Sequence, residues 1–201
     1  FYPGSDFVQK ISTSGQTPEQ SLYLRNLKNF KYNFLMVGTI EPRKGHKIIL
    51  DLFTQLWGLE ENNISLTFIG KEGWMVGELI KSINNSKYFN KTLFWFNNAS
   101  DSFLDLCYKE TDAVIVASLN EGFGLPIIEA AQRNCRIIAN DIPVFREVSP
   151  EGCFFLNLTN PIVALKQLKD WLKEPPKACL CPKTKSWKET AIQIARNTHL
   201  I

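Results

Sequence analysis

The chain has 201 residues, 44% hydrophobic and 21% charged, which is an ordinary composition for one globular domain with a sizeable core. Its formal net charge of +3 is too small to indicate nucleic-acid binding, so any anion site has to be local. The five cysteines are odd in number and form no paired CxxC motif, which favours free thiols in a reducing compartment over a disulfide framework or a zinc site.

The first part of the chain, residues 1–30, is polar and contains no basic stretch followed by an apolar run. No later segment is apolar for long enough to cross a bilayer. We therefore expect a cytoplasmic protein.

Short apolar runs then alternate with segments of helical period, in five rounds. The predicted strands lie at residues 34–38, 64–70, 92–96, 113–117 and 136–139, and the helices that follow them lie at 48–57, 76–83, 103–108, 125–133 and 144–148. A short strand at 153–156 and helices at 161–172 and 186–196 complete the pattern.

Strands that are apolar on both faces and alternate with helices predict an α/β fold, a doubly wound Rossmann-like parallel sheet. The nucleotide-binding body is expected at residues 31–174, followed by a crossing segment and a helix at 175–201. In such a sheet ligands bind at the carboxyl ends of the strands, where the strand order reverses. With the common order 3-2-1-4-5, the loops after Gly38 and Ala117 become neighbours at that point.

The loop after the first strand carries Arg43, Lys44 and Gly45. Arg engages two phosphate oxygens at once, Lys adds a compact charge, and Gly allows close backbone approach, so the loop suits a diphosphate. The alternative is a solvated turn before a helix, which is the usual fate of an isolated Arg-Lys pair.

The loop after the fourth strand carries two carboxylates, Glu121 and Glu129, around a Gly-Phe-Gly-Leu-Pro stretch. Pro126 suits the first position of the next helix, so the N–H groups near Gly122 and Gly124 would form an anion site opposite Lys44. A carboxylate at the end of the first helical turn suits neutral hydroxyls such as those of ribose.

The alternative for Glu129 is a surface ion pair with Arg133, and for Glu121 a plain loop acid. Because cations, helix start and carboxylates converge on one crevice, we favour function. His46 and His199 lack companions for a metal site or a triad and are expected on the surface. Trp74 stays open between a role in the crevice and none.

These motifs resemble those of the family-4 glycosyltransferases, whose fold is called GT-B. The stretch from Glu121 to Glu129 is similar to the family's E-x7-E signature, and the stretch from Glu41 to Gly45 to its diphosphate-gripping loop. Residues 70–74, 140–147 and 186–191 fall where the family has similar segments. The likeness covers nearly the whole chain and identifies it as the C-terminal, sugar-nucleotide-binding half of such an enzyme.

The resemblance implies retaining transfer of a hexose from a nucleoside-diphosphate sugar to a glycan or lipid-linked acceptor in polysaccharide biosynthesis, without a metal or other cofactor. Lys44 and Arg43 would neutralise the leaving diphosphate, Glu121 would hold hydroxyls of the donor sugar, and Glu129 would hold the ribose. The remaining contacts to sugar, phosphate and base would come from Gly122, Phe123, Gly124, Leu125, Trp95, Phe96 and Ser100. The aromatic residues 94–96 also fit a core strand, which is the commoner role for such a run.

Three departures from the family pattern stand out. Thr39 replaces a common Arg, and Asn134 stands where the family has Gly, a change that a left-handed helix cap tolerates. Residues 1–30 resemble the segment that follows the interdomain linker in this family, and no segment corresponds to the family's N-terminal domain. That domain would supply acceptor contacts and any peripheral association with the cytoplasmic membrane face. The expected partners are therefore the donor, that domain and the acceptor, with no nucleic acid.

The first-strand loop and residues 70–74 resemble bacterial mannosyltransferases, so GDP-mannose is the first candidate donor. The competing hypothesis is a scaffolding domain that keeps the fold without turnover. A Rossmann dehydrogenase needs a Gly-x-Gly-x-x-Gly turn after the first strand, which this chain lacks.

Overall fold

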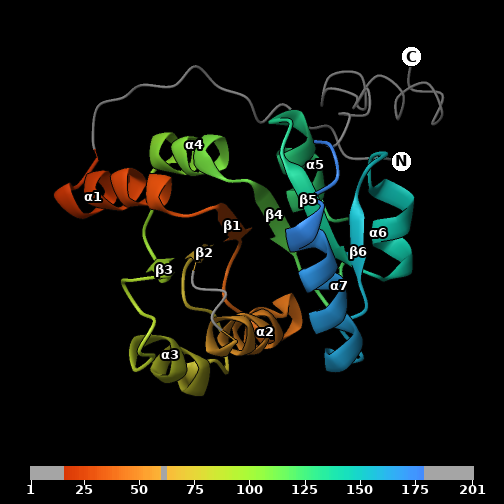
Figure 1. Cartoon of the computed structure of the whole chain (residues 1–201), viewed down its shortest axis with the longest axis horizontal. Coiled ribbons are helices and arrows are strands. Elements are labelled where there is room, and N and C mark those ends of the chain that lie inside the picture. The colour runs from red at the N-terminus through yellow and green to blue at the C-terminus, as the bar shows by residue number, and fades with distance from the viewer. Residues whose placement is uncertain (1–15, 60–62, 179–201) are drawn as a thin grey trace, which may run out of the picture.

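A computed structural model describes residues 16–59 and 63–178 and has one six-stranded parallel sheet (Figure 1). The strands, in the spatial order β3-β2-β1-β4-β5-β6, are β3 (Leu93–Phe96), β2 (Ile64–Ile69), β1 (Tyr32–Val37), β4 (Ala113–Val116), β5 (Arg136–Asn140) and β6 (Phe154–Leu156). The predicted fold class and the order 3-2-1-4-5 are confirmed. Because β1 pairs with both β2 and β4, the order reverses beside β1.

Helices cover both faces of the sheet. One face carries α2 (His46–Gly58), α3 (Gly77–Asn84) and α7 (Pro161–Lys173), and the other carries α1 (Pro18–Asn26), α4 (Asp101–Glu110), α5 (Leu125–Gln132) and α6 (Pro143–Val148). In Figure 1, α1 and α4 lie on one side of β1 to β3, and α2 and α3 on the opposite side. Two short 3-10 turns, η1 (Leu27–Asn29) and η2 (Pro42–Lys44), precede β1 and α2.

Alternate residues of each strand feed two separate cores. Phe34 and Met36 of β1 pack with the α2 and α7 side chains, whereas Leu35 packs with those of α4 and α5. The period of two along a strand sends successive side chains to opposite faces. Both faces are covered, so the strands are mostly apolar, as the sequence pattern indicated, with Asn33, Ser65 and Thr67 as buried polar exceptions in β1 and β2.

Helix α1 lies within residues 1–30, a segment that was expected to be polar and for which no helix was predicted. Thr17 caps it: its hydroxyl accepts from the Gln20 N–H, the Gln20 side chain accepts from the Thr17 N–H, and Pro18 begins the helix. Tyr23 and Leu27 lie in the core, which therefore draws on residues before position 31. The signal was a capping motif rather than an apolar stripe.

Several finer expectations can be checked at the ends of elements. Asn134 adopts φ 55° just after α5, as predicted for a left-handed cap. Pro126 takes the second helical position, because α5 begins at Leu125. The predicted helix at residues 186–196 lies outside the described residues.

Among the described residues, Cys107 is a buried cysteine that forms no disulfide. Within residues 16–59 and 63–178, no helix combines the length and the apolar character that spanning a membrane requires.

Candidate functional site

The loop after β1 is held against the end of β4 by a glycine. Gly45 ends η2 with φ 75°, and a Cβ there would lie 2.2 Å from the Ala117 carbonyl oxygen. The Leu119 N–H also donates to the Arg43 carbonyl oxygen at 2.8 Å. The close approach expected at Gly45 is therefore made by the protein's own backbone, and it joins the two loops at the switch point.

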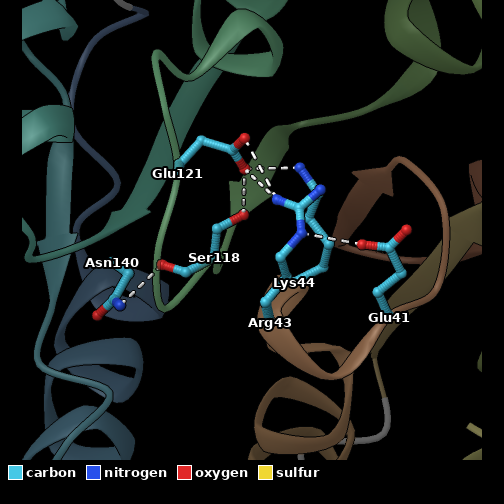
Figure 2. A network of polar contacts seen from close by, with 6 residues as sticks. All are labelled: Glu41, Arg43, Lys44, Ser118, Glu121 and Asn140. Atoms are coloured by element: carbon cyan, nitrogen blue, oxygen red, sulfur yellow. Dashed lines mark hydrogen bonds and ion pairs between the residues drawn. The ribbon is translucent and has the colours of Figure 1, made fainter. Parts of the chain in front are cut away.

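Side chains of these two loops form one charged network (Figure 2). Lys44 Nζ lies 2.6 Å from Glu121 Oε2, and the Ser118 hydroxyl donates to the same oxygen at 3.0 Å. Arg43 bridges the two glutamates, with Nη1 3.4 Å from Glu121 Oε2 and Nε 2.9 Å from Glu41 Oε2. The solvated-turn alternative therefore fails for Lys44, whose side chain is only 16% exposed.

The network keeps Glu121 ionised. Burial raises the pKa of Glu121, but hydrogen bonds and charge from Lys44, with smaller contributions from Ser118 and Arg43, bring it below its ordinary value. Asn140 at the end of β5 donates to the Ser118 carbonyl oxygen at 3.0 Å and so steadies the loop behind Glu121.

A solvent-open cavity of about 490 Å³ lies between Lys44 and the start of α5. Its lining brings together Val37, Gly38, Lys44, Glu121, Gly122, Phe123, Gly124, Leu125, Pro126 and Glu129. A helix of eight residues begins at this cavity with a glycine N-cap and no side-chain cap, and its dipole directs partial positive charge toward the cavity. Seven of the predicted site residues line one cavity, in agreement with the switch-point argument.

Glu129 also lines the cavity, and its carboxylate is more buried than that of Glu121. Its Oε2 accepts a hydrogen bond of 3.1 Å from the Tyr108 hydroxyl of α4. Burial raises the pKa of Glu129 above its ordinary value, opposed by the Tyr108 hydrogen bond and the charge of Arg133. Arg133 forms its short ion pair with Asp105, at 2.6 Å, and reaches the main-chain oxygen of Glu129.

The other predicted contacts lie outside the cavity lining. Arg43 joins the charged network at its exposed edge. Phe96 packs in the core, with its ring centroid 4.9 Å from those of Tyr23 and Phe103, so its side chain is unavailable to a base. Trp95 Nε1 donates to the Gly70 carbonyl oxygen, and Ser100 caps α4. The exposed residues of that loop are 97, 98 and 100.

His46 contradicts its predicted surface position. It is 2% exposed, its ring lies 5.1 Å from that of Phe68, and neither ring nitrogen has a hydrogen-bond partner among the described residues. The first residue of α2 faces the sheet because Gly45 turns the chain inward there. Among the described residues, no cluster of His, Cys, Asp and Glu could hold a metal ion.

Sequence reasoning missed Tyr108, Asn140 and the role of Ser118. Ser118 stood in the crevice loop, two residues after a buried strand, which was a usable signal. Tyr108 and Asn140 reach the site only through the packing of α4 against α5 and of β5 against β4, which periodicity does not specify.

Fold and site together define a doubly wound α/β domain with a cavity at its switch point, lined by the cation Lys44 and the start of α5. A family model for group 1 glycosyl transferases matches residues 25–193. The chain belongs to this family.

Named relatives agree with that assignment. The chain is 40% identical over 172 residues to the serotype-specific mannosyltransferase WbdA of Escherichia coli, covering 86% of this chain and 21% of that protein. It is 29% identical to the O-antigen chain mannosyltransferase RfbU of Salmonella typhimurium, over 74% of this chain and 40% of that protein. The chain thus spans about a fifth of the length of WbdA.

Solved structures show the same fold. Anabaena HepE, in complex with UDP and glucose, has a TM-score of 0.70 at 16% identity, covering 92% of this chain and 53% of that one. The C-terminal domain of the group 1 protein LpcC from Francisella tularensis has a TM-score of 0.62 at 20% identity, covering 85% of this chain and 89% of that one. The sheet is thus that of a GT-B glycosyltransferase.

Proposed function

We propose that this chain is the donor-binding part of a retaining hexosyltransferase of polysaccharide biosynthesis, with a nucleoside-diphosphate sugar, GDP-mannose first, as donor. The observation that carries the proposal is the joint lining of one cavity by Lys44, the start of α5, Glu121 and Glu129. A diphosphate fits between the ammonium and the helix start, where both favour negative charge.

The Lys44 ammonium would stabilise the departing phosphate as well as the bound donor. Negative charge grows on the departing phosphate during transfer, and a positioned cation stabilises it without having to reorganise. Glu121, which accepts a hydrogen bond from the Ser118 hydroxyl, holds Lys44 in place before ligand arrives. When the diphosphate binds, the Lys44 ammonium would contact both the phosphate and Glu121. Glu121 would then lie beside the sugar hydroxyls, in line with the role proposed for it.

Relatives support the choice of sugar and the pathway. WbdA and RfbU are named mannosyltransferases, and RfbU acts on the O-antigen chain. HepE was solved with UDP and glucose, so uridine donors are the first competitors to test. We propose an acceptor that is a glycan or is lipid-linked and is held by an opposing domain of the GT-B type.

The test is calorimetric titration of the chain with GDP, UDP, ADP and the matching sugar nucleotides. We expect dissociation constants on the order of micromolar to millimolar, because a one-sided crevice makes few simultaneous contacts. Tighter binding of GDP-mannose than of UDP-glucose supports the mannose donor. Binding of no nucleotide would contradict donor binding and favour the scaffold.

A further inference from the structure

The hydroxyl of Tyr108 lies in the protein interior and points at a cavity residue. Tyr108 is 2% exposed, and its hydroxyl donates to Glu129 Oε2 at 3.1 Å. Burial raises the pKa of Tyr108 well above its ordinary value, and the nearby charge of Glu129 raises it further, so the hydroxyl stays protonated and remains a donor.

The Tyr108 ring is itself fixed by charged neighbours. The guanidinium carbon of Arg133 lies 4.6 Å from the ring centroid, and the same guanidinium pairs with Asp105 through Nη2 at 2.6 Å and Nε at 3.1 Å. Arg133 also donates to the main-chain oxygen of Glu129 at 3.3 Å. The donor to the carboxylate is therefore held on a rigid support built from α4 and α5.

The two oxygens of the Glu129 carboxylate have different partners. Oε2 is occupied by Tyr108, so the carboxylate has one settled orientation, and Oε1 is the oxygen left for a ligand in the cavity. A short-range partner that fixes a carboxylate lowers the cost of ordering it when a ligand binds. Neutral vicinal hydroxyls suit a partly dehydrated carboxylate better than a phosphate does, since two negative groups repel.

We propose that Tyr108 is a positioning residue that aims Glu129 at the ribose hydroxyls of the nucleotide. This inference rests on the proposed function, because it needs a nucleotide in the cavity. It adds that ribonucleotide recognition depends on a residue of α4 that never touches the ligand.

The test uses Tyr108→Phe in the 201-residue chain, which keeps the ring under Arg133 and removes only the hydroxyl. The probes are the best-bound nucleoside diphosphate of the wild-type chain and its 2′-deoxy and 3′-deoxy forms. We expect the ribonucleotide to bind about fivefold to tenfold more weakly, which corresponds to the net contribution of about one ordinary hydrogen bond. The deoxy form that lacks the bonded hydroxyl should bind to Tyr108→Phe and to the wild-type chain with the same affinity.

Tyr23→Phe is the matched control. Tyr23 is 4% exposed and shares a hydrogen bond of 2.8 Å with Thr67, outside the cavity lining. The Tyr23→Phe variant should lose about as much stability as Tyr108→Phe does, but it should keep the wild-type preference for ribonucleotides over their deoxy forms. A second check places Tyr108→Phe in a Glu129→Ala chain, where removal of the hydroxyl should no longer change affinity.

The outcomes separate the two proposals. If the wild-type chain prefers ribonucleotides and Tyr108→Phe keeps the same preference, the positioning role is wrong and donor binding stands. Equal weakening for ribo and deoxy forms also contradicts positioning, since it is what general loosening of α4 would cause. If the wild-type chain binds no nucleotide, the proposed function and this inference fall together.

Discussion

Lys44 differs from the other lysine of its segment in how far it is removed from solvent. Its side chain is 16% exposed and pairs with Glu121 inside the site, whereas Lys47 is 60% exposed and pairs with Asp51 one turn along α2. Partial burial weakens solvent screening, so we expect the charge of Lys44 to be felt strongly by a phosphate. The two residues form a natural pair for measurement.

Lys44→Ala should weaken nucleoside diphosphates about tenfold to a hundredfold and leave the free nucleoside nearly unchanged, because only the phosphates carry charge. Titration at low and high salt checks this, since the loss should shrink as salt is added. Lys47→Ala should bind like the wild-type chain. Equal losses for nucleoside and diphosphate would remove the phosphate role.

His46 predicts a loss of stability in mild acid. Burial, and then the charge of Lys44, lower its pKa from 6.5 to about 4, so the folded chain binds a proton less readily than the unfolded chain. Stability is therefore unaffected above the unfolded pKa and falls as pH drops from there toward the folded pKa. Between about pH 7.5 and pH 5 the loss is about 2 kcal/mol.

His46→Leu, which is close in volume, should remove this contribution. Urea unfolding at the two pH values measures the effect as the difference between wild type and variant, which cancels the carboxylates common to both. At the higher pH the variant should be as stable as the wild type or more so, because the ring nitrogens have no partner among the described residues. An identical pH dependence in both chains would show that His46 titrates normally.

At this scale the sequence predicted residues whose position depends on the sheet alone. Lys44, Glu121 and Glu129 follow strands that the strand order brings together, so the crevice could be predicted from the sequence. The surface position predicted for His46 was wrong, because its burial depends on the φ of 75° at Gly45, which turns the first residue of α2 toward Phe68. Tyr108 was missed because its target lies on another helix.

At the scale of elements, Gly45 is the joint between η2, α2 and β4. A side chain there would meet the Ala117 carbonyl oxygen, and φ 75° strains any residue with a Cβ. Gly45→Ala should cost at least about 2 kcal/mol, because left-handed backbone costs roughly 1–2 kcal/mol and overpacking adds about 1–3. It should also weaken diphosphate binding, since Lys44 moves with the joint.

Gly58→Ala at the end of α2 is the control, because nothing lies within 4 Å of a Cβ there. Chemical unfolding should find it as stable as the wild-type chain or slightly more so. If Gly45→Ala unfolds at the wild-type midpoint, the loop contact drawn at Ala117 contributes nothing to stability.

Elements with strong periodicity were predicted well, and those without it were not. The six strands are short apolar runs, and the predicted and observed ranges differ by at most two residues at either end. Helix α1 has a weak apolar stripe and depends on its Thr17 cap and on Tyr23 fitting against Phe94 and Phe96, with ring centroids 4.9 Å apart. Such a helix is stabilised by tertiary packing, which sequence periodicity alone does not reveal.

At the scale of the whole molecule, the cavity is open to solvent, and its described lining, from the loops after β1 and β4 and the start of α5, would form one wall of the proposed donor site. As a separate polypeptide the 201 residues should therefore bind nucleoside diphosphates and transfer no sugar. Alignment of the acceptor with the donor carbon can contribute roughly 7–11 kcal/mol to a barrier, and one wall cannot supply it. A transfer assay on the chain, alone and with an N-terminal GT-B domain supplied, measures the difference. Full turnover by the chain alone would contradict the proposed division of labour.

Main-chain hydrogen bonds join the loops after β1, β2 and β4 to one another at the carboxyl edge of the sheet. The Leu119 N–H to Arg43 bond ties the β4 loop to the β1 loop, and bonds from Ile40 N–H to the Lys71 carbonyl and from Gly73 N–H to the Ile40 carbonyl tie in the β2 loop. The exposed residues 97–98 after β3 lie beyond these ties. If the loop from Trp95 to Ser100 borders the base, as the family resemblance implies, a library confined to residues 97–98 should change the nucleotide preference measured by titration and leave the thermal stability of the chain unchanged.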